Sequence, residues 1–407
     1  AINLPSNITI QGAGMWHSTF FGDPALYSNS SRRVAFYGNG NNIHLADFAI
    51  VGNLNYRNDT EPNDGLGGSY GTGSTLSRIW VEHTKTGAWL VNSLGLVVDG
   101  CRFRNTIADG INLCVGMRGT LVTNCTARGN GDDCFAIWPA TYTAQTYTPG
   151  LNVFDHCTGQ TPFLANCAAI YGGFSNTIQD CFFQDSSYGC GILISTTFPV
   201  GGNVFSGVNT VKRTDLNRCG GVDPAFGLRG SCLLFLDNSS LAGIAIQDVN
   251  IRNNLCDGLD IIAPGSNPAT GLGGLSNAVI SHVRIPDYGI AFNGSDALWA
   301  DSSAIGSMWV SNSAIVDFQN LSSRFIFRFT NTVSEITSFR VSPDNQVMLA
   351  YTATPGAPCH LEATTNLAGN FWNPVPGSTV IAGQPVVNFL DPNPQKPGTL
   401  FYRSVLP

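Results

Sequence analysis

A repeat of roughly 22 to 24 residues runs through most of the chain and constrains the fold more than any other feature of the sequence. Short segments rich in Val, Ile, Leu and Phe recur at this interval, each after a turn built mainly from Asp, Asn, Thr or Gly. Short strands at a fixed period without helices are typical of a parallel β-helix, in which each coil buries its apolar residues against its neighbours. The turns are Asp64-Gly65-Leu66, Thr86-Gly87-Ala88, Asp109-Gly110-Ile111, Asp133-Cys134-Phe135, Asn166-Cys167-Ala168 and Gly189-Cys190-Gly191, followed more loosely by Arg229-Gly230-Ser231, Asp257-Gly258-Leu259 and Tyr288-Gly289-Ile290.

We therefore predict an all-β chain in which residues 1–332 form a right-handed parallel β-helix, with loops between coils as the walls of a groove. The repeat decays after about Phe327, and strand-like segments separated by Pro, Gly and Asn follow. Residues 333–407 are predicted to form a small antiparallel β-sandwich. Two interpretations of its aromatic residues Phe371 and Trp372 stay open: they bind carbohydrate, or they pack in the core of a stabilising module. We favour the second.

Seven of the twelve cysteines recur at fixed positions within the repeat, which predicts packed thiols rather than disulfide bonds. Cys219 and Cys232 lie in a loop-rich stretch and are the better candidates for a disulfide. The seven are Cys101, Cys125, Cys157 and Cys181 in one set, and Cys134, Cys167 and Cys190 in the other.

Composition excludes several classes of function. The net charge of −7 comes without a basic patch, so we expect no nucleic-acid partner. No apolar run reaches the roughly 18 residues that a membrane span requires, so we expect no membrane partner. A charged fraction of 12% together with abundant Asn, Thr and Gly fits a secreted protein, which we expect to be a monomer.

Three aspartates lie about one repeat apart, namely Asp109 and the adjacent pair Asp132 and Asp133. One repeat corresponds to one step between neighbouring strands, about 4.7–4.9 Å. Each aspartate taken alone is more simply explained as a turn residue. Repulsion within the group of three, however, raises at least one pKa, so one carboxyl group stays protonated near neutral pH. Such a cluster can hydrolyse a glycosidic bond, since one acid protonates the leaving oxygen while a base activates water.

Neighbouring residues predict a sugar-binding groove. Trp138 and Tyr171 each follow the turn of their coil by five residues, so they occupy the same phase of adjacent coils. They either form a stacking platform for sugar rings or pack under a loop. We expect Asp64, Asn112 and Asn166 to bind substrate as well. The sequence leaves open the inverting spacing of acid and base, about 6.5–9.5 Å, and the retaining spacing, about 5–5.5 Å.

Other chemistries fit less well. The chain has no Gly-x-Ser-x-Gly motif and no phosphate-binding loop, and its six histidines show no metal-ligand spacing. His17, His44 and His83 are better explained as structural hydrogen-bonding residues. We expect no cofactor. The Asn- and Asp-rich stretch 53–64 offers oxygen ligands for a structural calcium ion, although its spacing matches no calcium loop.

The two acidic segments, Asp109-Gly110-Ile111-Asn112 and Gly131-Asp132-Asp133-Cys134, resemble the catalytic signature of the polygalacturonases. Those enzymes carry a Gly-His-Gly turn in the next coil and an Arg-x-Lys after it, both used for an anionic uronate. The corresponding positions here read Asn166-Cys167-Ala168 and Gly189-Cys190-Gly191. The resemblance without these basic residues favours a neutral sugar over pectin.

The wider sequence, roughly residues 5 to 270, resembles glycoside hydrolase family 87, the bacterial α-1,3-glucanases and mycodextranases. This resemblance implies an inverting endo-hydrolase of α-1,3-linked glucan that uses Asp109, Asp132 and Asp133. By the polygalacturonase pattern, Asp132 would be the general acid, while the other two position and activate water. The similar segments are Ile10-Gln11-Gly12-Ala13-Gly14-Met15-Trp16, Ile79-Trp80-Val81-Glu82-His83-Thr84-Lys85, Arg104-Asn105-Thr106-Ile107-Ala108-Asp109-Gly110-Ile111-Asn112 and Ala169-Ile170-Tyr171-Gly172-Gly173.

Two alternatives stay open. The chain is a dextranase-like or isopullulanase-like hydrolase if its loops select α-1,6 or α-1,4 linkages. It belongs to another class if it is a catalytically silent β-helix that binds polysaccharide.

Overall fold

The computed structural model describes most of the chain. The described residues are 1–22, 34–57, 64–186, 188–197, 204–223, 227–237, 239–264, 273–330, 336–342, 346–353, 358–365, 372–383, 386–391 and 401–405. They contain no helix long and apolar enough to span a membrane.

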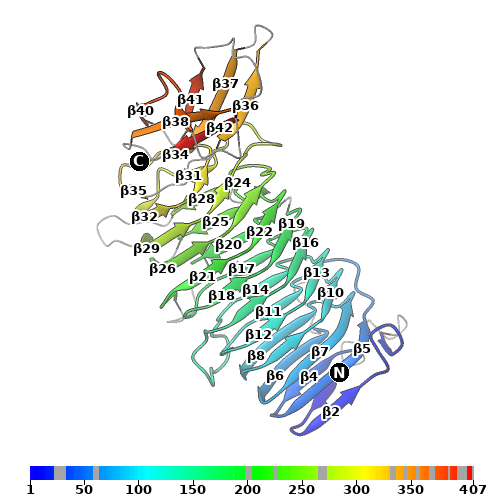
Figure 1. The fold of residues 1–407 in the computed structure, drawn as a ribbon. Coiled ribbons are helices and arrows are strands. Elements are labelled where there is room, and N and C mark those ends of the chain that lie inside the picture. The colour runs from blue at the N-terminus through cyan, green and yellow to red at the C-terminus, as the bar shows by residue number, and fades with distance from the viewer. Residues whose placement is uncertain are drawn as a thin grey trace.

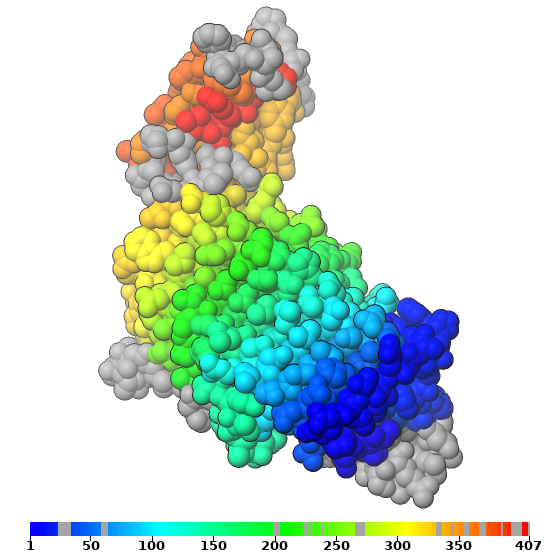
Figure 2. All heavy atoms as spheres, turned by 60° about the horizontal axis from the view of Figure 1, so that its bottom comes forward, coloured from blue at the N-terminus to red at the C-terminus, as the bar shows by residue number. Residues whose placement is uncertain are grey.

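Parallel strands stack coil upon coil into an elongated β-helix, as predicted (Figures 1 and 2). One side of each coil contributes a strand to a twelve-stranded sheet. In chain order its strands are β1 (Ile2–Leu4), β4 (Phe36–Asn39), β6 (Leu66–Thr72), β8 (Ala88–Leu94), β11 (Ile111–Leu113), β14 (Phe135–Ile137), β17 (Ala168–Ile170), β20 (Ile192–Ser195), β25 (Cys232–Phe235), β28 (Leu259–Ile262), β31 (Leu298–Ala300) and β34 (Phe318–Asn320).

The remaining sides of the coils form two columns of strands that join in a 21-stranded sheet. The long strands β5 and β7 pair with both columns and therefore connect them. The first column contains β2 (Ile8–Gln11), β5 (Ile43–Val51), β7 (Thr75–Glu82), β9 (Val97–Asp99), β12 (Leu121–Thr123), β15 (Val153–Asp155), β18 (Thr177–Gln179), β21 (Asn209–Lys212), β26 (Leu241–Gln247), β29 (Gly274–Ser281), β32 (Ile305–Ser311) and β35 (Phe325–Thr330). The second adds β3 (Thr19–Phe21), β10 (Arg102–Arg104), β13 (Thr126–Arg128), β16 (Thr158–Gln160), β19 (Phe182–Gln184), β22 (Asp215–Asn217), β27 (Asn250–Arg252), β30 (Arg284–Ile285) and β33 (Ala314–Ile315).

The strand register places like residues of successive coils directly on one another. In the first column, for example, Val122 pairs with Phe154, which pairs with Ile178. All three side chains are fully buried, and they belong to one core cluster that runs along the whole β-helix. Because a single coil cannot cover its own apolar residues, this stacking supplies the hydrophobic stabilisation.

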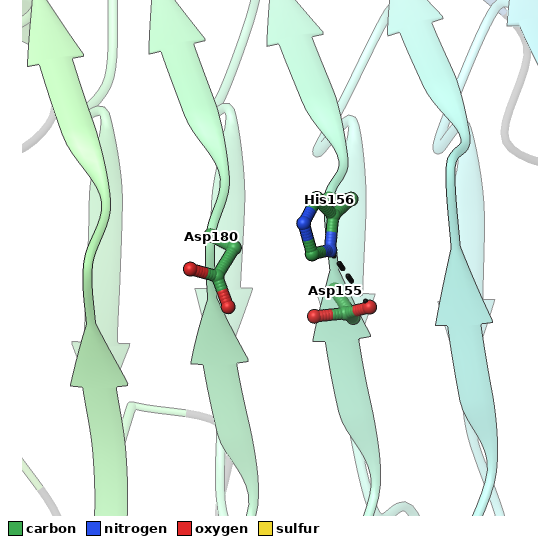
Figure 3. Close-up of side chains that lie close together, drawn as sticks. All are labelled: Asp155, His156 and Asp180. Carbon is green, nitrogen blue, oxygen red and sulfur yellow. Dashed lines mark ion pairs between the residues drawn. The ribbon is translucent and has the colours of Figure 1, made fainter.

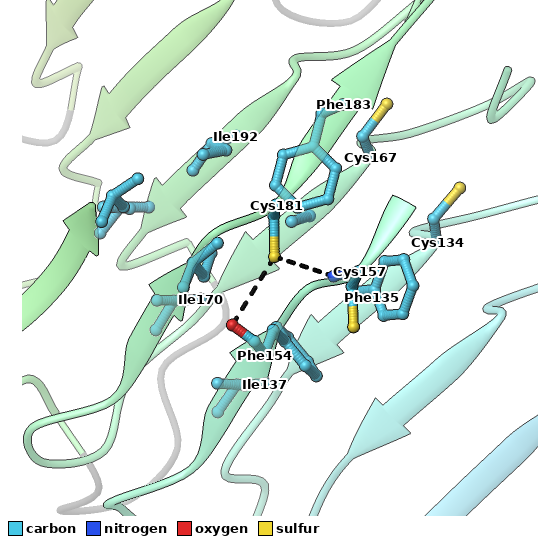
Figure 4. Packing of buried hydrophobic residues seen from close by; sticks show 14 of the residues in the cluster. Cys134, Phe135, Ile137, Phe154, Cys157, Cys167, Ile170, Cys181, Phe183 and Ile192 are labelled. Atoms are coloured by element: carbon cyan, nitrogen blue, oxygen red, sulfur yellow. Dashed lines mark hydrogen bonds between the residues drawn. The ribbon is translucent and has the colours of Figure 1, made fainter. Parts of the chain in front are cut away.

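A one-residue turn between the two columns precedes the first set of recurring cysteines, which are Cys101, Cys125, Cys157 and Cys181. Its residue adopts a positive φ, 53° at Asn124 and 53° at Asp180, a region that Asn and Asp tolerate better than most residues. The cysteine that follows points inward. The Cys181 thiol donates to the Phe154 carbonyl over 3.6 Å, and its sulfur accepts the Cys157 backbone N–H over 3.4 Å (Figure 4).

All twelve cysteines are buried free thiols, so the prediction for the seven periodic ones is confirmed. The disulfide predicted between Cys219 and Cys232 is wrong. Both residues point into the core of the β-helix rather than into a loop, and the Cys219 thiol donates to the Phe183 carbonyl over 3.6 Å. Two short strands that pair antiparallel lie between them in sequence, β23 (Gly221–Asp223) and β24 (Gly227–Arg229).

The C-terminal part consists of two small antiparallel sheets with a shared core, as predicted. Trp372 is half-buried and lies 4.5 Å from the guanidinium carbon of Arg403 rather than in the core, while Phe371 lies outside the described residues. The predicted boundary between residues 332 and 333 also falls outside them and stays a prediction. One sheet contains β36 (Ile336–Val341), β37 (Val347–Thr352) and β41 (Val386–Leu390), and the other β38 (Pro358–Thr364), β39 (Asn373–Pro374), β40 (Val380–Ile381) and β42 (Phe401–Val405).

Burial of every thiol predicts a simple reactivity pattern. A thiol-specific reagent should label almost no cysteine in the native protein and all twelve after unfolding in denaturant without reductant. Mass spectrometry of the labelled chain checks this. Ten labels after unfolding would indicate one disulfide and contradict the structure.

Candidate active site

The three aspartates occupy turns of two adjacent coils, in the vertical alignment that the repeat predicts. Gly87 N–H donates to the Asp109 carbonyl over 3.0 Å, and Gly110 N–H donates to the Asp133 carbonyl over 2.8 Å. In the next pair of coils, Cys134 N–H donates to the Asn166 carbonyl over 2.9 Å. Each turn is thus fixed by backbone hydrogen bonds, which makes the site a rigid part of the β-helix.

The three carboxyl groups converge at one point. One oxygen from each of Asp109, Asp132 and Asp133 lies within 4.8 Å of the other two. Asp109 is 6% exposed and Asp133 is 2% exposed, whereas the Asp132 side chain keeps 33% of its surface accessible. All three line a cavity of about 260 Å³. The cluster predicted from spacing is therefore present, with Asp132 as its most accessible member.

Asp133 is held by two residues of the following coil. Asn166 donates to its Oδ1 through the backbone N–H over 3.0 Å and through Nδ2 over 2.7 Å. The Tyr171 hydroxyl donates to its Oδ2 over 2.8 Å. Both carboxylate oxygens of Asp133 are thus occupied by donors, and the side chain has one defined orientation.

Asp109 and Asp132 have different partners. Asn112 Nδ2 donates to Asp109 Oδ2 over 3.2 Å, while the buried Asn112 Oδ1 has no hydrogen-bond partner. Asp132 Oδ1 accepts the backbone N–H of Asp133 over 3.1 Å. Its Oδ2 receives Arg57 Nη2 over 2.7 Å, an ion pair from a segment far away in sequence.

Burial and mutual repulsion shift the protonation of the cluster. Burial, followed by the charges of Asp132 and Asp133, raises the pKa of Asp109 well above its usual value. Burial and then the charge of Asp132 raise the pKa of Asp133 to about 7, against the hydrogen bonds from Tyr171 and Asn166. The buried part of the cluster therefore retains a proton near neutral pH, as the spacing predicts.

Aromatic side chains form one wall of the cavity. Trp89 and Trp138 meet edge to face with ring centroids 5.7 Å apart, and the Trp89 Nε1–H donates to the Tyr142 hydroxyl over 2.8 Å. Trp89 and Trp138 line the cavity together with Tyr171. The paired rings at the cavity are thus Trp89 and Trp138, and a stacking platform for sugar rings stays a prediction. Tyr171 is buried and serves Asp133 instead.

Two of the predicted substrate-binding residues lie behind the site. Asn166 contacts Asp133 and does not line the cavity. Asp64 does not line it either. Its Oδ1 accepts the Thr86 hydroxyl over 2.8 Å, and burial raises its pKa to about 6. Because both side chains are directed at neighbouring coils, direct substrate binding by Asn166 and Asp64 is not supported by their positions. Asn112 does line the cavity.

Sequence reasoning missed Arg57, Lys85 and Trp89. Trp89 could have been found, because the repeat pairs it with Asn112. Arg57 follows β5 outside the repeating strands, so periodicity carries no signal for it. It belongs to the stretch 53–64 considered for calcium, of which residues 58–63 lie outside the described structure.

A second acidic group lies on the outer face of the 21-stranded sheet, away from the cavity. It consists of Asp155, His156 and Asp180 (Figure 3). His156 Nδ1 lies 2.9 Å from Asp155 Oδ2, and Arg213 donates to both oxygens of Asp180 over 2.8 and 2.6 Å. Because His156 and Asp180 adopt the positive φ of the one-residue turn, a structural role accounts for this group.

Comparisons with known proteins identify the family of the chain. The family model described as the α-1,3-glucanase catalytic domain D2 matches residues 3–347. The catalytic unit of the thermostable GH87 α-1,3-glucanase from Streptomyces thermodiastaticus strain HF3-3 is 25% identical with a TM-score of 0.66, over 81% of this chain and 59% of that one. A comparison with curated proteins finds no match.

Two further similar structures are catalytic domains of GH87 α-1,3-glucanase. One, a variant in complex with tetrasaccharides, is 26% identical with a TM-score of 0.65, over 82% of this chain and 61% of that one. The other, in complex with nigerose, is 25% identical with a TM-score of 0.62, over 81% and 62%. The chain thus spans less than two thirds of the length of these proteins. Since the family model covers most of its residues, the chain belongs to the α-1,3-glucanase catalytic domain D2 family of glycoside hydrolases.

Proposed function

We propose that the chain hydrolyses α-1,3-glucosidic bonds in an α-glucan, with Asp109, Asp132 and Asp133 as the catalytic acids. The observation that carries this proposal is the convergence of three carboxyl groups in a cavity walled by Trp89 and Trp138. A retained proton supplies the acid, a neighbouring carboxylate supplies the base, and aromatic rings suit the faces of sugars. We also propose, from its composition, that the protein is secreted and monomeric.

The spacing of the aspartates supports this assignment. Solved structures of GH87 catalytic domains include three variants, each with one aspartate replaced by alanine and a bound oligosaccharide. The second of those aspartates follows the first by 23 residues, and the third is adjacent to the second. Asp109, Asp132 and Asp133 have the same spacing.

In the proposed mechanism Asp132 protonates the glycosidic oxygen, because it is the member most accessible from the cavity. Asp109 and Asp133 hold a water molecule and remove its proton as it attacks the anomeric carbon from the opposite face, which inverts the configuration. The oxygens of the triad lie closer than the about 6.5–9.5 Å of a usual inverting pair. Inversion therefore rests on the family resemblance rather than on this distance.

A second division of roles is consistent with the electrostatics. Burial raises the pKa values of Asp109 and Asp133, so one of these buried acids would donate the proton. Asp132, which is ion-paired with Arg57, would then be the base.

Two basic residues that line the cavity bear on the preference for a neutral sugar. The positions after the triad are uncharged, as in the sequence comparison with polygalacturonases, but Arg57 and Lys85 line the cavity from other coils. Arg57 is paired with Asp132, so it is not available for a uronate carboxylate. Because the buried acids retain a proton, the remaining carboxylates roughly balance these two cations, and the cavity has no excess positive charge to attract a uronate. This balance favours a neutral glucan.

Replacing Asp132 by Asn should lower kcat by about 10²–10⁴-fold, the usual contribution of a general acid or base. The assay measures reducing ends released from α-1,3-glucan, dextran, pullulan and polygalacturonate. Asp215→Asn, at an exposed ion pair with Arg252, is the control and should retain activity. Activity on dextran or pullulan alone would favour the alternative linkages, and binding without hydrolysis would favour the silent β-helix.

The anomeric form of the first product tests inversion. Proton NMR during the first minutes of hydrolysis of an α-1,3-glucan should show the β-anomer, with the α-anomer appearing later by mutarotation. Early release of the α-anomer would establish retention and remove the water-activating role from the buried pair.

Asp109→Asn should raise the free energy of unfolding at pH 8 and leave it nearly unchanged at pH 4. Because the folded-state pKa of Asp109 is raised, ionisation destabilises the folded protein as pH rises above the unfolded value, whereas Asn carries no charge. Urea denaturation at both pH values measures this difference. Equal effects of the substitution at pH 4 and pH 8 would contradict the described electrostatics, whatever the activity of the protein.

A further inference from the structure

Arg57 reaches the triad from outside the repeating coils. It follows β5, 75 residues before Asp132 in sequence, and its side chain is 30% exposed. Besides the ion pair to Asp132 Oδ2, its Nη1 donates to the Gly131 carbonyl over 2.9 Å and to the Ile107 carbonyl over 3.4 Å. One guanidinium therefore contacts a catalytic side chain and the backbone of both turns that carry the acids.

These two turns approach each other closely at Gly131. Its N–H donates to the Thr106 carbonyl over 2.9 Å and to the Ala108 carbonyl over 3.1 Å. A Cβ atom at this position would lie 2.1 Å from the Ile107 oxygen, so the close approach requires glycine. Arg57 donates to carbonyls on both sides of this contact, and it thereby joins the Asp109 turn to the Asp132 turn.

Several charged or titratable groups lie around Asp132 at the cavity, namely Asp109, Asp133, Tyr171, Lys85 and Arg57. Among these described groups, Arg57 contacts Asp132 Oδ2 directly, at 2.7 Å. The ion pair therefore fixes where the Asp132 carboxylate lies.

We propose that Arg57 is a positioning residue for hydrolysis, which holds the Asp132 carboxylate and its turn in place. The inference rests on the proposed function for its kinetic readout. It extends that function by assigning the triad a cationic partner from a non-repeating segment. In either division of roles, Arg57 holds the Asp132 carboxyl group where it lines the cavity.

The test compares Arg57→Gln, which removes the cation, with Arg57→Lys, which keeps it. Arg78→Gln is the matched control, because Arg78 makes an ion pair of 2.6 Å to Asp47 on the outside of the β-helix. The measurements are kcat and KM on α-1,3-glucan oligosaccharides from pH 4 to pH 9. Arg57→Ala is assayed with and without added guanidinium chloride at millimolar concentrations, with sodium chloride as the salt control.

In Arg57→Gln we expect kcat at the pH optimum to fall about tenfold with little change in KM, because the Asp132 carboxylate loses the group that holds it. We expect substantial recovery of kcat in Arg57→Lys, and saturable rescue of Arg57→Ala by guanidinium.

An unchanged kcat in Arg57→Gln, or a fall in kcat that neither Arg57→Lys nor guanidinium restores, would overturn the inference. Failure of the proposed function is recognised separately, because the wild type would then hydrolyse none of the glucans. In that case Arg57 is tested by a crystal structure of Arg57→Gln. An unchanged Asp132 rotamer and unchanged distance between the two turns would overturn its positioning role.

Discussion

The hydrogen-bonded stacking of one coil on the next is the constraint on which the rest of the structure depends. It fixes neighbouring turns about one strand spacing apart, and so it decides which side chains meet. Asp109 and Asp133 face each other for the same reason that Val122 and Phe154 do. In the core the spacing brings apolar groups into contact and stabilises the fold. At the turns it brings carboxyl groups together in a buried place, which destabilises the fold. Burial first, and repulsion between the carboxyl groups second, raises the pKa values of Asp109 and Asp133.

This constraint explains what the sequence could predict. The β-helix, the buried cysteine columns and the convergence of the three aspartates all follow from residues that recur at one phase. Because each coil lies one strand spacing from the next, residues that recur at one phase are in contact, whatever loops connect the coils. The same stacking explains why the disulfide prediction is wrong. Cys219 follows β22 and points into the core, as the periodic cysteines do. Its phase was obscured by inserted residues, and composition alone suggested a loop.

Features without a period could not be predicted. Arg57 lies in the connection after β5, and the path of this connection is set by tertiary contacts. No pattern in the neighbouring sequence predicts that Arg57 approaches Gly131. The sequence pattern also did not determine in which direction the side chains near the turns point. Trp138 and Tyr171 do share a phase, yet one packs on Trp89 while the other donates to Asp133. Alternation along a strand does not extend through the turn, so which of two aligned residues faces substrate depends on details of the turn that the sequence pattern does not carry.

The repeat places the three aspartates close together. Closeness alone would leave them as three acids with similar properties. Catalysis requires them to differ, because one must donate a proton while another accepts one. The differences come from unlike surroundings: Asp133 has Asn166 and Tyr171 on its two oxygens, Asp109 has Asn112, and Asp132 has Arg57 and access to the cavity. Asn166, Tyr171 and Asn112 belong to the repeat, but Arg57 does not. The repeating fold therefore assembles the cluster. A non-repeating segment supplies the cation that makes the surroundings of Asp132 differ from those of Asp109 and Asp133.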